Sequence, residues 1–200
     1  YIEPLRTAFS GLFRGKTAGE VSLTAANEGV DLLLIMEGKP DLLMREKLAA
    51  LANRLGLVRI SWKQKVRNGK SDLEIILTQK AVTIFLGDTR VNLPADGFVQ
   101  PTGAGEISLI SSVLSVLRPG NVVLDLFAGS GTFALAAAKT RAQVHAVEFD
   151  STQLEALKTA AKIEDFSELV TCEKRDLKRR PMLEPELRRY DVVILDPPRA

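Results

Sequence analysis

The second half of the chain alternates between short apolar runs and helix-like segments, and this alternation constrains the fold more than any other feature. The strand-like runs are NVVLDLF, QVHAVEF, LVTCEK and DVVILD, and helix-like segments such as FALAAAKT and TQLEALKTAAKI lie between them. Strands that alternate with helices form parallel sheets whose faces the helices cover. The sequence therefore predicts a doubly wound, Rossmann-like α/β domain over residues 97–200.

Residues 1–96 lack this rhythm and predict a smaller α+β domain of mostly antiparallel strands. The stretch EVSLTAANEGVDLLLIMEG predicts a hairpin that turns at residues 27–29. A helix follows, with Asp41 as its N-cap and Gly56 as its C-terminal stop. Three more strand candidates come next, and the Asn-Gly pair at residues 68–69 indicates a hairpin. The Gly- and Pro-rich stretch NLPADGFVQPTGAGE then marks the domain boundary.

The composition excludes several classes of protein. Hydrophobic residues make up 46% of the chain and charged residues 26%, which is typical of a globular protein in water. No apolar run approaches the roughly 20 residues that span a bilayer, and the amino end lacks the pattern of a secretory signal. A single cysteine excludes an internal disulfide and a cysteine-built metal site. We expect a cytoplasmic monomer without membrane contact.

The two ends of the sequence suggest a longer protein. The chain begins with Tyr1 rather than Met, and it stops just after the strand-like run DVVILD. A parallel sheet that stopped there would leave an unpaired edge. We expect a fragment whose Rossmann-like domain lacks its C-terminal part.

A glycine-rich turn, AGSGTF, follows the first strand of the alternating half. In doubly wound sheets, ligands bind beyond the carboxyl ends of the strands. Gly129 and Gly131 allow the backbone to turn tightly and to approach a ligand closely. The third glycine of the dinucleotide fingerprint is absent, and Ala134 is the nearest small residue to its position.

Four strands in succession carry an acidic residue at or near their carboxyl ends. Glu148 lies about 20 residues after the glycine turn, where a carboxylate accepts hydrogen bonds from the ribose hydroxyls of an adenosine. Asp176 is expected near the adenine edge, and Asp125 is expected to stabilise the turn. Each acid alone is more simply a helix cap or a solvated charge, but Glu148 and Asp196 together with the glycines indicate a binding site. A cationic adenosine cofactor suits these carboxylates better than a pyrophosphate does, which predicts S-adenosylmethionine and methyl transfer.

The strand ending in ILDPPRA completes a set of four motifs. The two prolines make a rigid bend, and Arg199 stands where amino-group methyltransferases often carry an aromatic residue. Together with FVQ, LDLFAGSGTFAL and VHAVE, this stretch resembles the RNA uracil-5-methyltransferase family, which makes 5-methyluridine in transfer RNA and 23S ribosomal RNA. The resemblance covers residues 80–200 well and the first part more loosely.

The resemblance implies which residues contact the cofactor. One is Gln100 of the FVQ motif. Four lie in or beside the glycine turn: Phe127, Gly129, Gly131 and Thr132. Three lie at or after the ends of later strands: Glu148, Asp176 and Asp196. Asp196 is also a candidate catalytic residue. The chain departs from the family at Thr102 and Thr132, where the family often has Asn.

The resemblance also implies that the catalytic groups lie elsewhere. In this family a cysteine thiolate adds to carbon 6 of uracil and a base removes the proton from carbon 5. Both groups follow the Asp-Pro-Pro-Arg segment, so they are expected after Ala200, and the fragment alone is expected to be inactive. Cys172, inside an apolar strand, is expected to be a core residue. An iron–sulfur cluster, which some members carry, is possible only in a missing N-terminal region.

A basic strand is the candidate RNA contact of the first domain. In VRISWKQKVR, strand alternation places Arg59, Lys63, Lys65 and Arg67 on one face and Trp62 on the apolar face. A basic face suits phosphate contact, but a solvated edge strand protected by lysines explains the same pattern. A second basic cluster, KRDLKRRP, follows the third strand of the alternating half, and His145 is expected to be structural.

Two other functions remain open at this point. A methyltransferase for another RNA or protein target would not need the downstream cysteine. A non-catalytic module that binds RNA or the cofactor would need neither the cysteine nor the base. A nicotinamide dehydrogenase fits poorly, because the pocket is rich in acids and the third glycine is absent.

Overall fold

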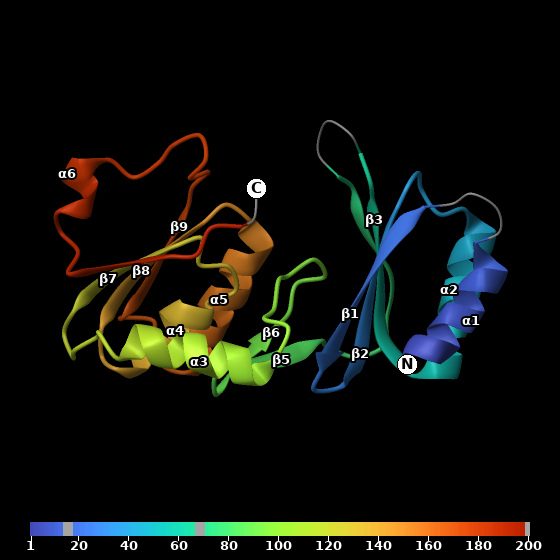
Figure 1. The fold of residues 1–200 in the computed structure, drawn as a ribbon, viewed down its shortest axis with the longest axis horizontal. Coiled ribbons are helices and arrows are strands. Elements are labelled where there is room, and N and C mark those ends of the chain that lie inside the picture. Colours follow the sequence, from blue (N-terminus) through green and yellow to red (C-terminus); the bar gives the residue numbers. More distant parts are fainter. Residues whose placement is uncertain (14–17, 67–70, 199–200) are drawn as a thin grey trace. The chain divides into compact units, whose positions relative to one another are not determined.

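The computed structural model describes residues 1–13, 18–66 and 71–198 and contains two compact units (Figure 1). The first unit is Tyr1–Thr83 and the second is Ile84–Ala200. The sequence places the boundary after residue 96. In the structure, the short hairpin that precedes that position contacts a helix of the second unit and groups with it, except for its first residue, Thr83.

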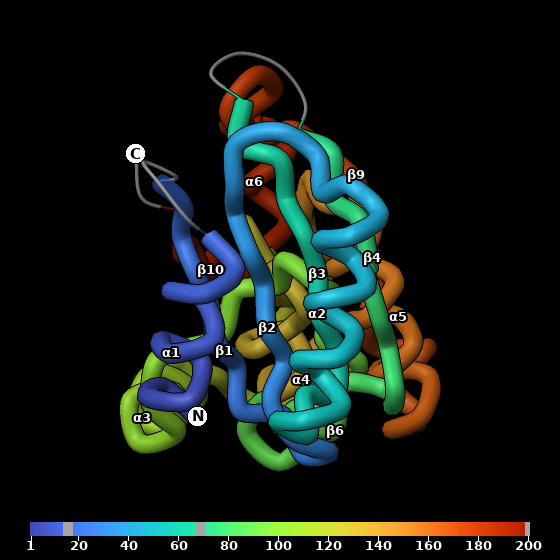
Figure 2. The backbone as a smooth tube through the Cα atoms, turned by 90° about the vertical axis from the view of Figure 1, so that its right-hand side faces the viewer, coloured from blue at the N-terminus to red at the C-terminus, as the bar shows by residue number. Residues whose placement is uncertain are grey.

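The first unit is a four-stranded sheet with two helices on one face (Figure 2). Its elements are α1 (Ile2–Leu12), β1 (Gly19–Ala26), β2 (Gly29–Met36), α2 (Leu42–Leu55), β3 (Leu57–Gln64) and β4 (Leu73–Thr78). The strand order is β1-β2-β3-β4; β1 and β4 pair antiparallel with their neighbours, whereas β2 and β3 are parallel. The parallel pair arises because α2 carries the chain back to the start of the sheet.

Local signals in the sequence set the ends of α2. The Asp41 side chain accepts a hydrogen bond from the Met44 N–H at 2.7 Å, as expected of an N-cap. Gly56 ends the helix with φ of 65°, in the left-handed region that glycine adopts readily. The predicted β1–β2 hairpin also forms, while the hairpin predicted at residues 68–69 lies outside the described residues.

The core of the first unit lies between the helices and the sheet. Leu32, Leu34, Leu48 and Ile60 are fully buried there. Trp62 joins this core with 5% exposure, as predicted, and its Nε1–H donates to the Gly38 carbonyl at 3.0 Å.

A buried ion pair links β2 to β3. Asp31 and Arg59 are register partners in the parallel pair, and both side chains are buried. Arg59 Nε donates to Asp31 Oδ1 at 2.9 Å, and Arg59 Nη2 donates to Asp31 Oδ2 at 2.6 Å. This two-point geometry is the strong form of an arginine–carboxylate contact. The pair is compatible only with this register of the two central strands.

The second unit is a parallel sheet flanked by helices, preceded by a short hairpin. Its elements are β5 (Thr83–Leu86), β6 (Thr89–Asn92), α3 (Gly103–Leu114), β7 (Val122–Leu126), α4 (Thr132–Lys139), β8 (Gln143–Glu148), α5 (Ser151–Ile163), β9 (Val170–Lys174), α6 (Glu184–Leu187) and β10 (Val192–Leu195). The strand order is β10-β7-β8-β9, with every neighbouring pair parallel. The chain passes from one edge, β9, to the other, β10, so the sheet is doubly wound.

The two faces of this sheet are covered differently (Figure 1). On one face α4 packs against β8 and α5 against β9, and α4 is buried from Phe133 to Ala138. On the other face Leu124, Leu126 and Val147 pack against Leu177 of the segment that contains α6. Because strand side chains alternate between faces, Asp125 lies on the α4 side.

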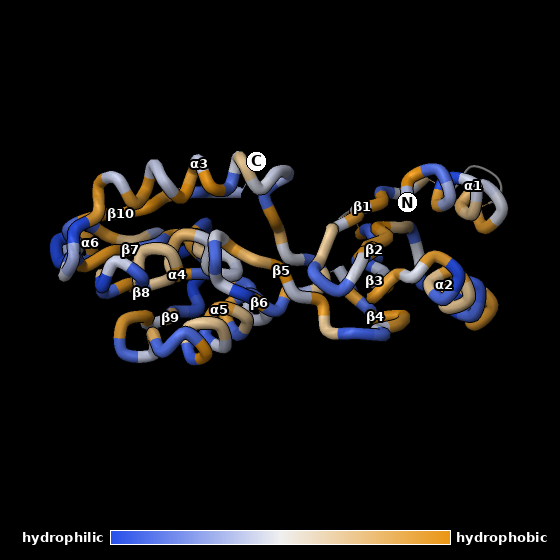
Figure 3. Tube along the Cα trace, turned by 90° about the horizontal axis from the view of Figure 1, so that it is seen from below, coloured by the Kyte–Doolittle hydropathy of each residue, from blue (hydrophilic) through white to orange (hydrophobic). Residues whose placement is uncertain are grey.

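Helix α3 leaves part of its apolar surface open. Figure 3 shows hydrophobic residues recurring along this helix, and Ile107 and Leu109 are 61% and 44% exposed. Within the described residues, no helix combines the length and apolar character needed to cross a bilayer.

Replacing Asp31 with Ala should lower the free energy of unfolding by about 3–5 kcal/mol, because it takes the carboxylate away from a buried guanidinium. The matched control is Glu20→Ala, since Glu20 forms an exposed ion pair with Lys65, and it should cost far less. Urea denaturation of both variants measures the difference. Equal losses would contradict a structural role for the buried pair.

Candidate functional site

The glycine turn lies directly beyond the carboxyl end of β7. Three residues in five have positive φ: Phe127 at 62°, Gly129 at 57° and Gly131 at 103°. Phe127 is not a glycine, so its left-handed conformation costs energy that the surrounding contacts must offset. The Ala128 N–H bonds to the Val147 carbonyl at 3.1 Å, which attaches the turn to the end of β8.

Gly131 is required by space as well as by conformation. A Cβ atom at this position would lie 2.3 Å from Cδ1 of Leu157, which is fully buried. At Gly129 the nearest atom to an added Cβ would be Gln153 Oε1 at 3.2 Å. Gly131 is also the N-cap of α4, so the free N–H groups of the helix start come directly after the glycine turn.

Glu148, the last residue of β8, holds this turn in place. Its Oε2 accepts a hydrogen bond from the Gly129 N–H at 3.0 Å. Its Oε1 accepts from the N–H groups of Phe149 at 2.7 Å and Asp150 at 2.9 Å. A carboxylate accepts about four hydrogen bonds in all, so capacity for a ligand hydroxyl remains on Oε2.

Asp125 is buried beneath the turn. It is 0% exposed, and its carboxylate oxygens make no hydrogen bond of ordinary geometry with a described residue, although the Ala134 N–H lies close enough to favour the ionised form. Burial raises the pKa of Asp125 to about 7; the Ala134 amide opposes this rise, and the charges of Asp196 and Glu148 add to it. Near neutral pH this carboxyl is therefore partly protonated.

Ser130 is a second unpaired polar group in the same turn. It is 5% exposed, and its Oγ has no hydrogen-bond partner among the described residues. Buried polar groups are nearly always hydrogen-bonded in folded proteins. The unpaired Ser130 and Asp125 therefore fit a site that is completed by a ligand or by ordered water.

The remaining two acids stand at the same edge of the sheet. Asp176 follows β9 and accepts hydrogen bonds from the N–H groups of Lys178 at 3.1 Å and Arg179 at 3.2 Å. Asp196 directly follows β10 and is exposed. Parallel pairing therefore brings the predicted acids of four strands to one edge, around the glycine turn.

The other predicted cofactor residues lie on loops and on the start of α4. Gln100 is half-buried in the loop before α3, and Thr132 is the half-buried first residue of α4. Phe127 packs against the core beneath α6. Thr102, where the family often has Asn, is the N-cap of α3 and accepts from the Gly105 N–H at 3.1 Å. Both residue types cap helices well, so this departure preserves the local structure.

Phe149 is a candidate site residue that the sequence analysis missed. It follows Glu148 directly and is 61% exposed. An exposed aromatic ring beside the glycine turn offers a face on which a base can stack. The available signal was its position, a large aromatic residue immediately after the acid that ends the second strand.

The structure buries one member of the predicted basic face of β3. Arg59 is buried in its ion pair with Asp31, because the parallel register places the two residues opposite each other. Lys65 pairs with Glu20 at 2.8 Å, and Lys63 is half-buried. Arg67 lies outside the described residues. Arg59 is thus held inside the unit, and Lys65 shares its charge with Glu20 in an exposed ion pair.

Cys172 is half-buried in β9, at the margin of the core rather than inside it. Burial raises the pKa of its thiol. The thiolate is the nucleophilic form of cysteine, so this environment disfavours a catalytic role.

His145 is part of a structural hydrogen-bond chain. Arg189 donates to the Tyr190 hydroxyl at 2.6 Å, and this hydroxyl bonds to His145 Nδ1. With Tyr190 as the donor, the His145 proton lies on Nε2, which faces Glu173 at 3.2 Å. Burial is the main cause that lowers the pKa of His145; Glu173 opposes it, and Arg189 and Arg175 add to it.

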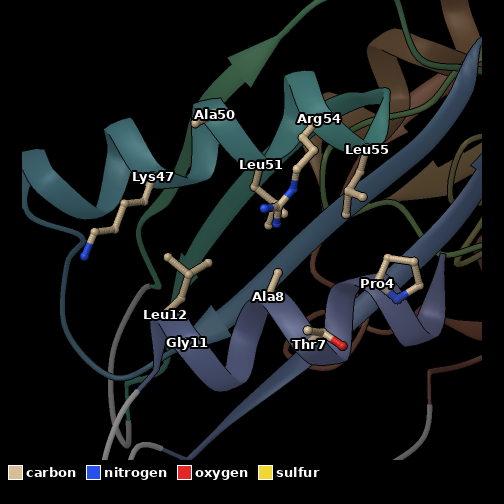
Figure 4. Close-up of a pocket in the computed structure, with 10 residues that line it drawn as sticks. All are labelled: Pro4, Thr7, Ala8, Gly11, Leu12, Lys47, Ala50, Leu51, Arg54 and Leu55. Carbon is tan, nitrogen blue, oxygen red and sulfur yellow. The ribbon is translucent and has the colours of Figure 1, made fainter.

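A large groove lies elsewhere, between α1 and α2 (Figure 4). Its volume is about 710 Å³, and none of its ten lining residues carries a carboxylate. Lys47 and Arg54 lie along it on α2. Its chemistry therefore differs from that of the acid-rich edge of the second unit.

A protein-family model described as "Conserved hypothetical protein 95" matches residues 101–200, which is half of the chain. The chain belongs to this family. The matched residues include the whole parallel sheet, the glycine turn and the four acids at its edge.

Curated relatives extend the match over the first unit. An uncharacterized RNA methyltransferase of Zymomonas mobilis is 36% identical over 196 residues, which are 98% of this chain and 47% of the relative. A 23S rRNA (uracil(1939)-C(5))-methyltransferase of Marinomonas sp. is 31% identical over 147 residues, which are 72% of this chain and 32% of the relative. The chain thus spans about half the length or less of the curated relatives that it matches.

A solved structure shares the fold. The tRNA (uracil-54, C5)-methyltransferase of Pyrococcus abyssi, crystallised with S-adenosyl-L-homocysteine, superposes with a TM-score of 0.68 and 19% identity. The match covers 98% of this chain and 50% of that one. The predicted fold is confirmed: a Rossmann-like methyltransferase sheet preceded by a mostly antiparallel region.

Gly131→Ala should destabilise the second unit more than Gly129→Ala does. Both substitutions place a side chain at positive φ, which costs roughly 1–2 kcal/mol. Only the Cβ at position 131 also clashes with the buried Leu157. Calorimetric melting of the two variants compares them, and equal melting temperatures would contradict the spatial argument.

Asp125 should make the protein less stable as pH rises from about 4 to 7. The folded state raises the pKa of this carboxyl from 3.8 to about 7. Between these two values the folded chain keeps a proton that the unfolded chain has lost. The free energy of unfolding therefore falls as pH rises through this range. Asp125→Asn should remove this part of the slope. Denaturation at several pH values measures it, and parallel pH profiles for the two proteins would contradict the assignment.

Proposed function

We propose that this chain is the cofactor-binding part of an S-adenosylmethionine-dependent RNA methyltransferase. The observation that carries the proposal is the edge of the parallel sheet, where Glu148 is hydrogen-bonded to the glycine turn and further carboxyls stand on the neighbouring strands. This edge is where doubly wound folds bind nucleotide ligands.

The charge of the site favours a cationic adenosine cofactor. Asp125 is buried beside the turn, and the charges of Asp196 and Glu148 act on it. A pyrophosphate would add negative charge to this group and be repelled. A sulfonium would favour the ionised form of Asp125 and reduce the electrostatic cost of its burial.

The proposed contacts follow from the positions of the side chains. Glu148 accepts the ribose hydroxyls, Asp176 stands near the adenine edge, and Phe149 stacks on the base. Gln100, Phe127, Gly129, Gly131, Thr132 and Asp196 complete the pocket. When bound, S-adenosylmethionine supplies the methyl group.

RNA is the proposed substrate because the curated relatives are named RNA methyltransferases. Carbon 5 of uridine is the proposed methyl acceptor. The four motifs of the sequence and the Marinomonas relative, which is named a uracil-C(5)-methyltransferase, support this choice. The nucleophilic cysteine and the base are proposed to follow Ala200, and the 200 residues alone are proposed to be inactive. We assign no iron–sulfur cluster to them, because one cysteine cannot provide its ligands.

The test uses a chain that continues past Ala200, RNA containing 5-fluorouridine, and S-adenosylmethionine. Fluorine at carbon 5 cannot leave as a proton, so the adduct between the protein and carbon 6 should persist. We expect a protein–RNA band on a denaturing gel that depends on the cofactor.

Two controls show what the absence of a trapped protein–RNA band means. Cofactor binding is measured on the same protein, and methyl transfer to unmodified RNA is followed with radiolabelled cofactor. Methyl transfer without a trapped band would overturn the uridine carbon-5 assignment and retain an RNA methyltransferase. Cofactor binding without transfer to any RNA would favour a binding module instead.

A further inference from the structure

We propose that the loop after β9 is a phosphate-contacting surface for RNA, through Lys178, Arg179 and Arg180, which we call the basic loop. This inference rests on the proposed function and deepens it. The basic loop takes the place of the basic strand of the first unit as the candidate RNA contact, because Arg59 and Lys65 of that strand are engaged in ion pairs.

The basic loop begins beside the candidate cofactor site. The Arg175 N–H donates to the Glu148 carbonyl at 2.9 Å, which attaches the start of the loop to the end of β8. Asp176 then bonds to the N–H groups of Lys178 and Arg179 and shapes the turn that carries the cations. The residue expected at the adenine edge and the basic side chains thus belong to one turn.

A buried arginine anchors the loop. Arg175 is 8% exposed, and its Nη1 and Nη2 donate to Glu186 Oε1 and Oε2 at 2.6 Å and 3.0 Å. The same guanidinium bonds to the carbonyls of Arg180 at 2.8 Å and Pro181 at 2.8 Å. One side chain therefore ties together both ends of the segment, and the turn is held in a fixed conformation.

Arg175 also forms an ion pair with Glu186, an acid that could otherwise neutralise the cations of the basic loop. Hydrogen bonds from Arg175, and then from the Leu183 N–H, lower the pKa of Glu186 to about 2. Glu184 pairs with Arg188 at 2.7 Å. Both acids of α6 therefore form their close ion pairs with arginines outside the basic loop, and the charge of Arg180 adds only the smallest of the effects on Glu186.

The cations of the basic loop stay in solvent. Lys178, Arg179 and Arg180 are exposed, and the Arg179 side chain is 89% exposed even though it lies 3.5 Å from Asp176. Neither Lys178 nor Arg180 forms an ion pair with an acidic side chain in the part of the chain that the structure describes. Three exposed cations on one turn create a local positive potential that attracts an anionic partner.

The chemistry of the loop favours phosphates over bases. Leu177 and Met182, its large apolar residues, pack into the core beneath α6. Bases are read by stacking and by edge contacts, whereas phosphates are bound by lysine and arginine with little sequence preference. The basic loop would hold the RNA backbone while another part of the protein selects the base.

The test removes the three charges and measures RNA affinity at several salt concentrations. The loop variant is Lys178→Gln, Arg179→Gln, Arg180→Gln. The control variant, Arg118→Gln, Arg141→Gln, Lys162→Gln, removes the same charge from exposed residues elsewhere in the second unit. The probe is a short, fluorescently labelled, uridine-containing RNA hairpin. Binding of S-adenosylmethionine and melting temperature are measured for every protein.

We expect the loop variant to bind the RNA at least about ten-fold more weakly at physiological salt, with a salt slope lower by about 2. The control variant should keep most of the affinity, and cofactor binding should be unchanged in both. Equal RNA affinity and slope for the loop variant and the wild type would overturn the loop proposal alone. Equal weakening in both variants would also overturn it, because net charge rather than the loop would then be responsible. A wild-type protein that binds the cofactor but no RNA would contradict the proposed function itself.

Discussion

The candidate site depends on one carboxylate. Glu148 ends β8, and its two carboxylate oxygens accept hydrogen bonds from N–H groups of the glycine turn and of the start of the next loop. This contact joins the ends of two adjacent parallel strands, so the turn after β7 cannot move without β8. The left-handed conformations of Phe127 and Gly131 are tolerated because the turn is held in this way. Any ligand that bonds to Glu148 is consequently placed against the turn.

The second unit accommodates the buried charges of Arg175 and Asp125 in two different ways. Arg175 has Glu186 and two carbonyls, and it fixes the loop after β9. Asp125 has no such partner, and its pKa rises instead. A cationic ligand is the natural complement of that group. The same unit would thus present acids toward a cofactor and exposed cations toward an anionic polymer.

Local patterns in the sequence predict the structure that depends on nearby residues. Asp41 and Gly56 mark the two ends of a helix through contacts within one turn, and strand alternation and spacing predict that Glu148 stands beside the glycine turn. Local patterns do not predict the burial of Arg59, whose partner Asp31 lies 28 residues away and meets it only through the parallel register of β2 and β3. The burial of Asp125 likewise depends on how α4 packs, which no local pattern encodes.

The most direct test of the account is whether Glu148 binds the ribose of the cofactor or only supports the turn. Calorimetric titration of wild type and Glu148→Ala, each with S-adenosylmethionine and with its 2′-deoxy analogue, forms a double-mutant cycle. The account predicts that removing the hydroxyl weakens binding to the wild type several-fold and leaves binding to the variant nearly unchanged. The same loss in both proteins, or no measurable binding to the wild type, would contradict it.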